Sequence, residues 1–193
     1  MNQRLKITAT VLCALCVAIA ADTPAAPLPR DGYYGRVGLG YSPYARTALD
    51  LSASSVNETG LAPSLTAGVI WDRAHSVELS WQNIYFFGDT KGSQGTLCFS
   101  YTRYLQKRGP APFLALGFGL QWGPFPAVSP TSALETDEGV ALTFGGGVRF
   151  SRQTLARVDY SFGSTNKFIN SNTNFDYRHR QLVFSLQYTL FGG

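Results

Sequence analysis

The feature that most constrains the fold is an alternation of large apolar residues with small or polar residues. It is clearest in three segments, Leu114–Trp122, Val140–Phe150 and Leu182–Leu190. A period of two is the period of a β-strand, whose side chains point alternately to opposite faces of the sheet. No helical or heptad period is found past residue 20. The sequence therefore predicts an all-β fold.

The same alternation, followed along the whole chain, predicts eight strands. They are Gly32–Ser42, Pro63–Trp71, Ser76–Phe87, Gly95–Leu105, Phe113–Trp122, Gly139–Phe150, Leu155–Gly163 and Gln181–Phe191. Each has about 9 to 12 residues, the length that a tilted strand needs to cross a bilayer. Three of the four odd-numbered links are long (43–62, 123–138 and 164–180), whereas the even-numbered links are short, as in barrels with long outer loops and tight periplasmic turns. We therefore expect residues 32–193 to form an eight-stranded antiparallel up-and-down transmembrane β-barrel.

One face of the predicted strands is apolar and carries large aromatic side chains near the strand ends. Two aromatic girdles around an aliphatic middle are typical of the two interfaces of a membrane. The expected girdle residues are Tyr33, Trp71, Tyr101, Phe150 and Tyr188 toward the periplasm, and Tyr41, Tyr85, Trp122 and Phe162 toward the outside. The alternative is a soluble barrel, whose opposite face should carry many Lys and Glu residues. That face is instead rich in Gly, Ser and Thr, which favours a membrane barrel with a narrow interior.

The N-terminus predicts export from the cytoplasm. Arg4 and Lys6 precede a mostly apolar run at residues 7–20, and Ala18-Ile19-Ala20 matches a signal-peptidase site. We expect residues 1–20 to be a cleaved signal peptide and residues 21–31 to be an extended leader. Cleavage leaves Cys98 as the single cysteine, so no disulfide within the chain is expected. It also lowers the formal charge from +4 to about +2, which gives no argument for nucleic-acid binding.

Five charged residues occupy the alternate positions whose side chains are expected to point to the inner face, which we call inward parity. They are Arg36, Glu78, Arg149, Arg157 and Asp159. Charges in a narrow interior must be paired and hydrogen-bonded, because an isolated buried charge is too costly. We expect a lumen network of these side chains, which either fixes the strand register as a polar plug or acts as a gate in a narrow channel that favours anions. The plug is the preferred interpretation, since eight strands leave room only for side chains.

Signal peptide, eight alternating strands, aromatic girdles and a charged interior together resemble the small outer-membrane barrel families typified by OmpA and OmpX. The resemblance implies a bacterial outer-membrane protein without a cofactor, in a structural, adhesive or surface-interaction role rather than a catalytic one. It also implies contact with outer-membrane lipid and lipopolysaccharide, assembly by the barrel-insertion machinery, and a monomer. One departure is the C-terminus, where Phe191 has the opposite parity from Tyr188 and Leu190.

A catalytic alternative concerns lipid A, because some eight-stranded barrels modify it. The lipid A deacylase family carries a His-x-Ser-Asn motif late in the chain, and Asp159-Tyr160-Ser161-Phe162 lacks both its His and its Asn. Ser161 and His179 share inward parity on neighbouring predicted strands, and Asp176 is close in sequence. A nucleophile, a base and an orienting acid could then meet. We consider a chance placement far more common than such a site, and expect no catalytic residues.

Basic residues in the last long loop define a second candidate site. Lys167, Arg178 and Arg180 could contact lipopolysaccharide phosphates or a partner at the outer rim. The alternative is an ordinary solvated loop, which is the commoner situation for surface charge. Two scattered histidines and three cysteines, two of them in the signal peptide, form no recognisable ligand cluster, so no metal site is expected.

Overall fold

The computed structural model describes residues 31–49, 55–87, 93–106, 110–124, 136–170 and 173–192. These residues form eight strands: β1 (Gly32–Leu49), β2 (Ser55–Trp71), β3 (His75–Phe86), β4 (Ser93–Tyr104), β5 (Ala111–Pro124), β6 (Thr136–Arg149), β7 (Thr154–Asn170) and β8 (Thr173–Gly192). The predicted fold class is confirmed. The predicted signal peptide and all but the last residue of the leader lie outside the described residues.

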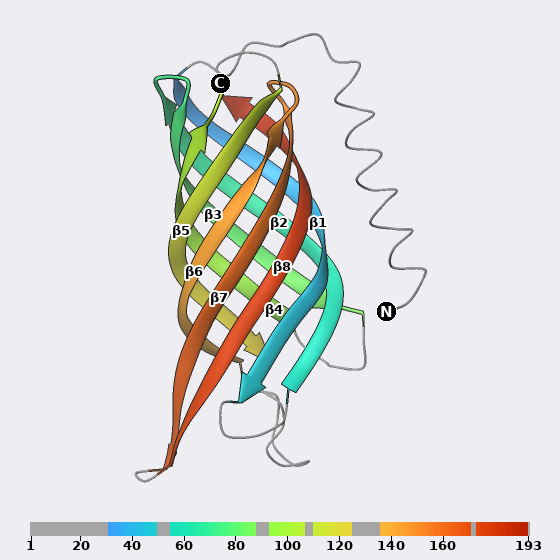
Figure 1. Cartoon of the computed structure of the whole chain (residues 1–193), viewed down its shortest axis with the longest axis vertical. Coiled ribbons are helices and arrows are strands. Elements are labelled where there is room, and N and C mark those ends of the chain that lie inside the picture. Colours follow the sequence, from blue (N-terminus) through green and yellow to red (C-terminus); the bar gives the residue numbers. More distant parts are fainter. Residues whose placement is uncertain are drawn as a thin grey trace.

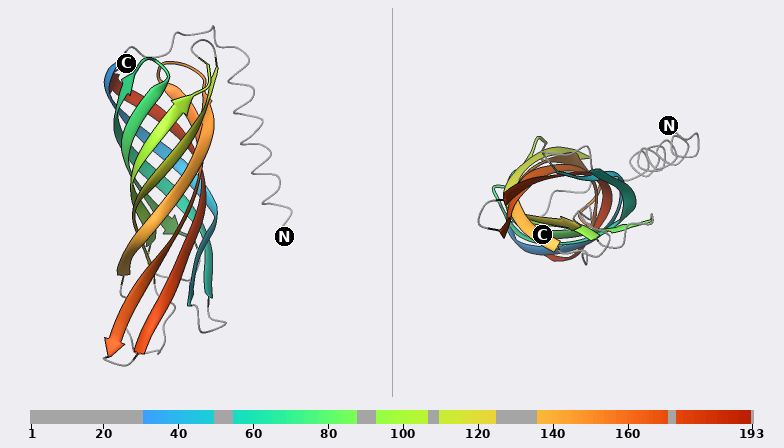
Figure 2. Two further views of the ribbon diagram at one scale, coloured as in Figure 1. Left: turned by 60° about the vertical axis from the view of Figure 1, so that its left-hand side comes forward. Right: turned by 90° about the horizontal axis from the view of Figure 1, so that it is seen from below.

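The strands form one closed antiparallel barrel, in which each strand pairs with the next along the chain. The barrel closes where β1 pairs with β8, for example Val37 with Tyr188 and Tyr34 with Gly192. Figure 2 shows the closed ring along the barrel axis. Closure leaves no strand edge unpaired, which a sheet requires in hydrocarbon because lipid offers no hydrogen bonds to the backbone. No helix among the described residues is long and apolar enough to cross a membrane.

The two ends of the barrel differ. At one end, the turn end, β1 begins and β8 finishes, and the short turns 72–74 and 150–153 join β2 to β3 and β6 to β7. At the other, the hairpin end, the β7–β8 and β1–β2 hairpins project beyond the remaining strands (Figure 1). Outer-membrane barrels place their short turns in the periplasm and their longer connections outside. By this rule we expect the hairpin end to be the outer end.

Four strands extend seven or eight residues beyond their predicted ends. β1 continues to Leu49 and β2 starts at Ser55, while β7 continues to Asn170 and β8 starts at Thr173. Most of the predicted loops 43–62 and 164–180 is therefore hydrogen-bonded hairpin. The physical reason is that apolar alternation marks the lipid-facing part of a strand, whereas backbone pairing continues into water, where no apolar face is needed.

A β-bulge interrupts β1 at residues 42–45. Ser42 pairs with Gly60 on β2 and Ala45 with Glu58, so one strand advances three residues while its partner advances two. Both Ser42 and Ala45 are buried, so the bulge reverses the alternation and turns Arg46 to the outer face. Pro43 lies within the bulge, where its missing N–H breaks no regular ladder bond.

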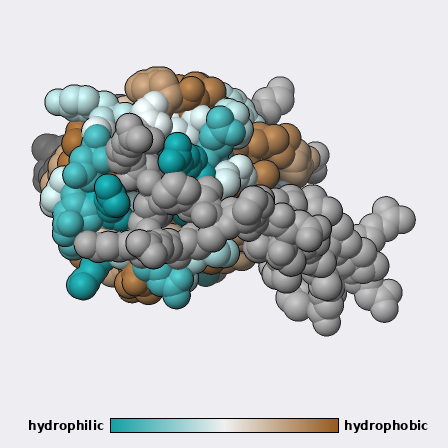
Figure 3. Space-filling model, turned by 90° about the horizontal axis from the view of Figure 1, so that it is seen from above, coloured by the Kyte–Doolittle hydropathy of each residue, from teal (hydrophilic) through white to brown (hydrophobic). Residues whose placement is uncertain are grey.

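The outer face of the barrel is apolar. Side chains such as Leu39, Leu114, Leu116, Phe118 and Val140 are more than half exposed. In Figure 3, which looks onto the turn end, many of the coloured residues on this end are hydrophilic, and hydrophobic residues lie at its periphery. A continuous apolar belt of this kind is stable only against lipid.

The inner face is made of small residues because the interior is crowded. A Cβ atom added at Gly117 would lie 2.5 Å from Sγ of Cys98 and 2.8 Å from Cβ of Ser100. Glycine at this position leaves room for the side chains of the neighbouring strand β4. The space that remains in the interior is occupied by the polar side chains described next.

Candidate functional site

The charged residues of the interior form a network centred on Glu78. Nη1 of Arg36 lies 3.1 Å from Oε1 of Glu78, and Nη1 of Arg157 lies 2.7 Å from Oε2. Nε of Arg157 also donates to both carboxylate oxygens of Asp159, each at 2.8 Å. β1, β3 and β7 thus supply the four side chains, all of which are buried. Two arginines and two acids balance one another within the barrel.

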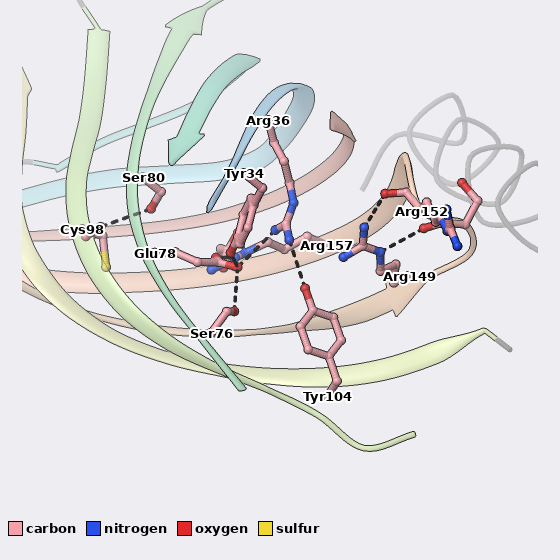
Figure 4. A network of polar contacts seen from close by, with 12 residues as sticks. Tyr34, Arg36, Ser76, Glu78, Ser80, Cys98, Tyr104, Arg149, Arg152 and Arg157 are labelled. Atoms are coloured by element: carbon pink, nitrogen blue, oxygen red, sulfur yellow. Dashed lines mark hydrogen bonds and ion pairs between the residues drawn. The ribbon is translucent and has the colours of Figure 1, made fainter. Parts of the chain in front are cut away.

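Hydroxyl groups add further hydrogen bonds to this network (Figure 4). Oε1 of Glu78 accepts a hydrogen bond from Tyr34 at 2.7 Å and a longer one from Ser76 at 3.4 Å. Nη2 of Arg36 donates to the hydroxyl of Tyr104 at 3.0 Å. The guanidinium carbon of Arg36 lies 4.1 Å from the ring centroid of Tyr34. The cost of removing Glu78 and Arg36 from water is therefore offset by several short contacts rather than by one ion pair.

Arg149 was expected to pair with the acids of the network, but its guanidinium group instead donates hydrogen bonds to the turn that follows β6. Its Nε donates to the carbonyl oxygen of Ser151 at 2.9 Å, and its Nη2 donates to the carbonyl oxygen of Arg152. Arg149 thus holds the turn between β6 and β7. Tyr104 and Ser76 were not predicted as members of the network, although both have inward parity on β4 and β3.

The network lies between apolar and uncharged layers. Buried residues at the turn end form an apolar cluster: Tyr34, Ile70, Tyr104, Ala111, Phe113 and Leu155. A second cluster in the outer half contains Ala45, Ala62, Ile84 and Val183. Between the network and this second cluster lie Ser, Thr and Gln side chains around a cavity of about 20 Å³, which holds about one water molecule. The described side chains of the interior therefore pack around the network and leave a small cavity beside it.

Ser161 and His179 are both buried inside the barrel. The Ser161 hydroxyl lies 2.8 Å from the hydroxyl of Thr143 on β6. On β8, Ser161 is opposite Gln181, whereas His179 is opposite Gly163. The two candidate catalytic residues are thus offset by two positions along the hairpin. The side chain of Asp176 lies outside the described residues.

Eight of the nine predicted girdle residues lie on the outer face. Tyr33, Trp71, Tyr85, Tyr101, Phe162 and Tyr188 are exposed, and Tyr41 and Trp122 are half-buried. Phe150 is only 7 % exposed, so its assignment to the girdle is wrong. β6 ends at Arg149, and beyond the strand end alternation no longer determines which way a side chain points.

His75 belongs to the turn-end girdle. Its ring stacks between Trp71 and Tyr101, with centroid distances of 6.0 and 5.8 Å, and its Nδ1 contacts the Tyr101 hydroxyl. This histidine is the first residue of β3 and is half-buried.

Three arginines project from the outer wall near the hairpin end. Arg46 on β1 pairs directly with Arg180 on β8, and Arg178 is two residues further along β8, opposite Ala48. All three side chains are exposed. Sequence reasoning included Arg178 and Arg180 but missed Arg46, because it fell in a predicted loop and the bulge that turns it outward has no clear sequence signal. The side chain of the third predicted rim residue, Lys167, lies outside the described residues.

The closed barrel, its apolar belt and its filled polar interior define the class of protein. This is a small eight-stranded outer-membrane β-barrel, and the belt places it in the outer membrane. Among the described residues, no group of His, Cys, Asp or Glu side chains is arranged to hold a metal ion.

Comparisons with known proteins agree with this class at the level of fold. Neisserial surface protein A (NspA) superimposes with a TM-score of 0.55 at 13% identity, covering 86% of this chain and 99% of that chain. Ail of Yersinia pestis superimposes with a TM-score of 0.49 at 14% identity, covering 83% of this chain and 100% of that chain. OprG of Pseudomonas aeruginosa superimposes with a TM-score of 0.46 at 13% identity, covering 86% of this chain and 99% of that chain. No protein-family model and no curated protein match the sequence.

Proposed function

We propose that this protein is a non-catalytic outer-membrane barrel that holds the β1–β2 and β7–β8 hairpins at the outer surface for structural or interaction roles. The observation that carries the proposal is the contrast between a filled interior and long projecting hairpins. A barrel that is packed inside has its variable surface only at its ends. Connections on a rigid scaffold are where binding residues are usually found.

The packed lumen argues against the channel alternative. A conducting path must be lined by groups that bind ions weakly and are accessible to water. Here Glu78 is engaged by Arg36, Arg157 and Tyr34, and the two apolar clusters lie on either side of the charged layer. An ion would have to break the network and then cross an apolar layer.

The position of Ser161 and His179 argues against the lipid A-modifying alternative. Both side chains point into the barrel, whereas the acyl chains of a membrane lipid lie outside its wall. The Ser161 hydroxyl is also engaged by Thr143 rather than by a base. A nucleophile must reach its substrate and be activated by a base within hydrogen-bond reach, and neither condition is met by this pair.

Conductance tests the sealed lumen. We expect purified, refolded protein in a planar bilayer to give no unitary current steps, because apolar clusters flank the charged network and the cavity beside it holds about one water molecule. A large porin refolded by the same protocol serves as the positive control. Its current steps would show that the refolding procedure and the bilayer support conduction. Reproducible anion-selective steps from this protein would favour the channel instead.

Surface labelling tests the orientation on which the proposal depends. Cys98 is buried, so a cysteine introduced at an exposed site is the reactive one in the mature chain. We expect Asn57→Cys, on the exposed β1–β2 hairpin, to react with a membrane-impermeant maleimide on intact cells. The matched variant Arg152→Cys, in the β6–β7 turn, should react only after the outer membrane is permeabilised. The opposite pattern would place the hairpins in the periplasm and end the proposal.

A further inference from the structure

The outward arginines of β1 and β8 stand at a sharp chemical boundary. Along the outer face of β8, Leu186, Phe184 and Leu182 are followed by Arg180 and Arg178. Arg180 is also opposite Phe162 of the outer aromatic girdle on β7. The change from apolar to cationic side chains thus occurs within two residues, about 7 Å along a strand. This is where the hydrocarbon of the outer leaflet gives way to its headgroups.

Two of these arginines repel each other unless an anion lies between them. Arg46 and Arg180 are directly opposite on neighbouring strands and both point outward, and like charges in such a pair are destabilising. Among the described residues, no carboxylate forms an ion pair with either of them. Arg178 adds a third guanidinium on the same face of β8. An arrangement of three guanidinium groups matches a ligand that carries phosphate, which arginine binds through paired hydrogen bonds.

We propose that Arg46, Arg178 and Arg180 form a binding site for the phosphorylated headgroup of lipid A, the membrane anchor of lipopolysaccharide. The site faces the bilayer rather than the lumen, and lipid A carries its phosphates at the boundary where its acyl chains end. The acyl chains would lie against the apolar residues below, such as Leu182 and Phe184. This inference rests on the proposed orientation, with the hairpin end outside, but not on a sealed lumen. The conductance experiment therefore does not test it.

The first test is lipid binding, measured by native mass spectrometry of the refolded barrel in detergent. The variant R46Q/R178Q/R180Q should bind diphosphorylated lipid A on the order of 100-fold more weakly than the unsubstituted protein, since each arginine near an anionic headgroup contributes severalfold. The matched control R73Q/R103Q/R152Q removes three exposed arginines from the turn end and should bind as the unsubstituted protein does. Heat-modifiable migration on gels checks that both variants fold.

Three results would overturn the proposal. The first is equal binding by the unsubstituted protein and R46Q/R178Q/R180Q. The second is equal binding of fully dephosphorylated lipid A, which would show that the acyl chains alone are recognised. The third is displacement of lipid A by inorganic phosphate at the same concentration, which would assign the arginines to a free anion rather than to a lipid.

A second test uses stability and separates ligand binding from a structural role. In phosphatidylcholine vesicles, Arg46→Gln should raise the urea midpoint of unfolding, because it relieves the repulsion between Arg46 and Arg180. In vesicles that also contain diphosphorylated lipid A, the same substitution should lower the midpoint, because it removes a ligand contact. The same sign in both membranes would contradict the proposal.

Discussion

Replacing Glu78 with Gln should destabilise the barrel by about 3–5 kcal/mol, the usual cost of removing one partner of a buried ion pair. Glutamine keeps the size of the side chain but removes the charge that balances Arg36 and Arg157. Arg157 would keep its contact with Asp159, whereas Arg36 would lose its carboxylate partner inside the barrel. The measurement is urea unfolding in lipid vesicles, followed by tryptophan fluorescence.

A second substitution distinguishes charge imbalance from a general loss of packing. Adding Arg36→Met to Glu78→Gln leaves Arg157 paired with Asp159 and restores electrical balance. We expect the double variant to be more stable than Glu78→Gln alone by at least about 1 kcal/mol, because neighbouring members of one network are not additive. If the destabilisation of the double variant equals the sum of the destabilisations caused by Arg36→Met and Glu78→Gln alone, the network contributes no more than its separate contacts.

Replacing Phe118 with Arg should destabilise the barrel by about 2–4 kcal/mol, the cost of a cation on the lipid face at the bilayer midplane. Phe118 lies midway between Leu114 and Trp122 on the outer face of β5 and is 61 % exposed. A long side chain at this depth cannot easily reach either interface. The same urea titration measures the effect.

The matched control places the same cation at an interface. Leu190, which is 58 % exposed, lies on the outer face near the turn end of β8. There Leu190→Arg should cost only about 0–1 kcal/mol. A second control, Phe118→Leu, removes the aromatic contact with Phe99 without adding a charge. The ring centroids of Phe118 and Phe99 are 5.9 Å apart. Equal effects of the two arginine substitutions would mean that the outer face does not contact lipid, and would favour a soluble barrel.

Sequence periodicity was sufficient for the architecture but not for the lengths of the strands. All eight strands were predicted, because lipid on one side and a narrow interior on the other impose strict alternation between Leu114 and Trp122 and in the equivalent segments. The outer parts of β1, β2, β7 and β8 carry no such pattern, because a strand beyond the hydrocarbon needs no apolar face. Their pairing depends on the partner strand, which local sequence does not specify.

The charged residues of the interior were predictable by parity, but their partners were not. Parity places Arg36, Glu78, Arg157 and Asp159 inside, yet which atoms meet depends on the register and on the tilt between β1, β3 and β7. Arg149 has the same parity as the others and contacts a turn instead. Tyr104 was not predicted as a partner of Arg36, although its position in the alternation places it inside the barrel. Arg46 was missed for a different reason, namely that a bulge changes parity without changing composition.

The pairing of β1 with β8 has a consequence for how the protein forms. Tyr34 pairs with Gly192, so the ladder that closes the barrel joins nearly the two ends of the folded chain. A contact of such long sequence separation must wait for the whole chain and gives the fold a high contact order, which slows folding. Until that ladder forms, β1 and β8 are both open edges in hydrocarbon. Loss of the last residues of β8 should therefore hinder closure of the entire barrel, rather than fray one strand.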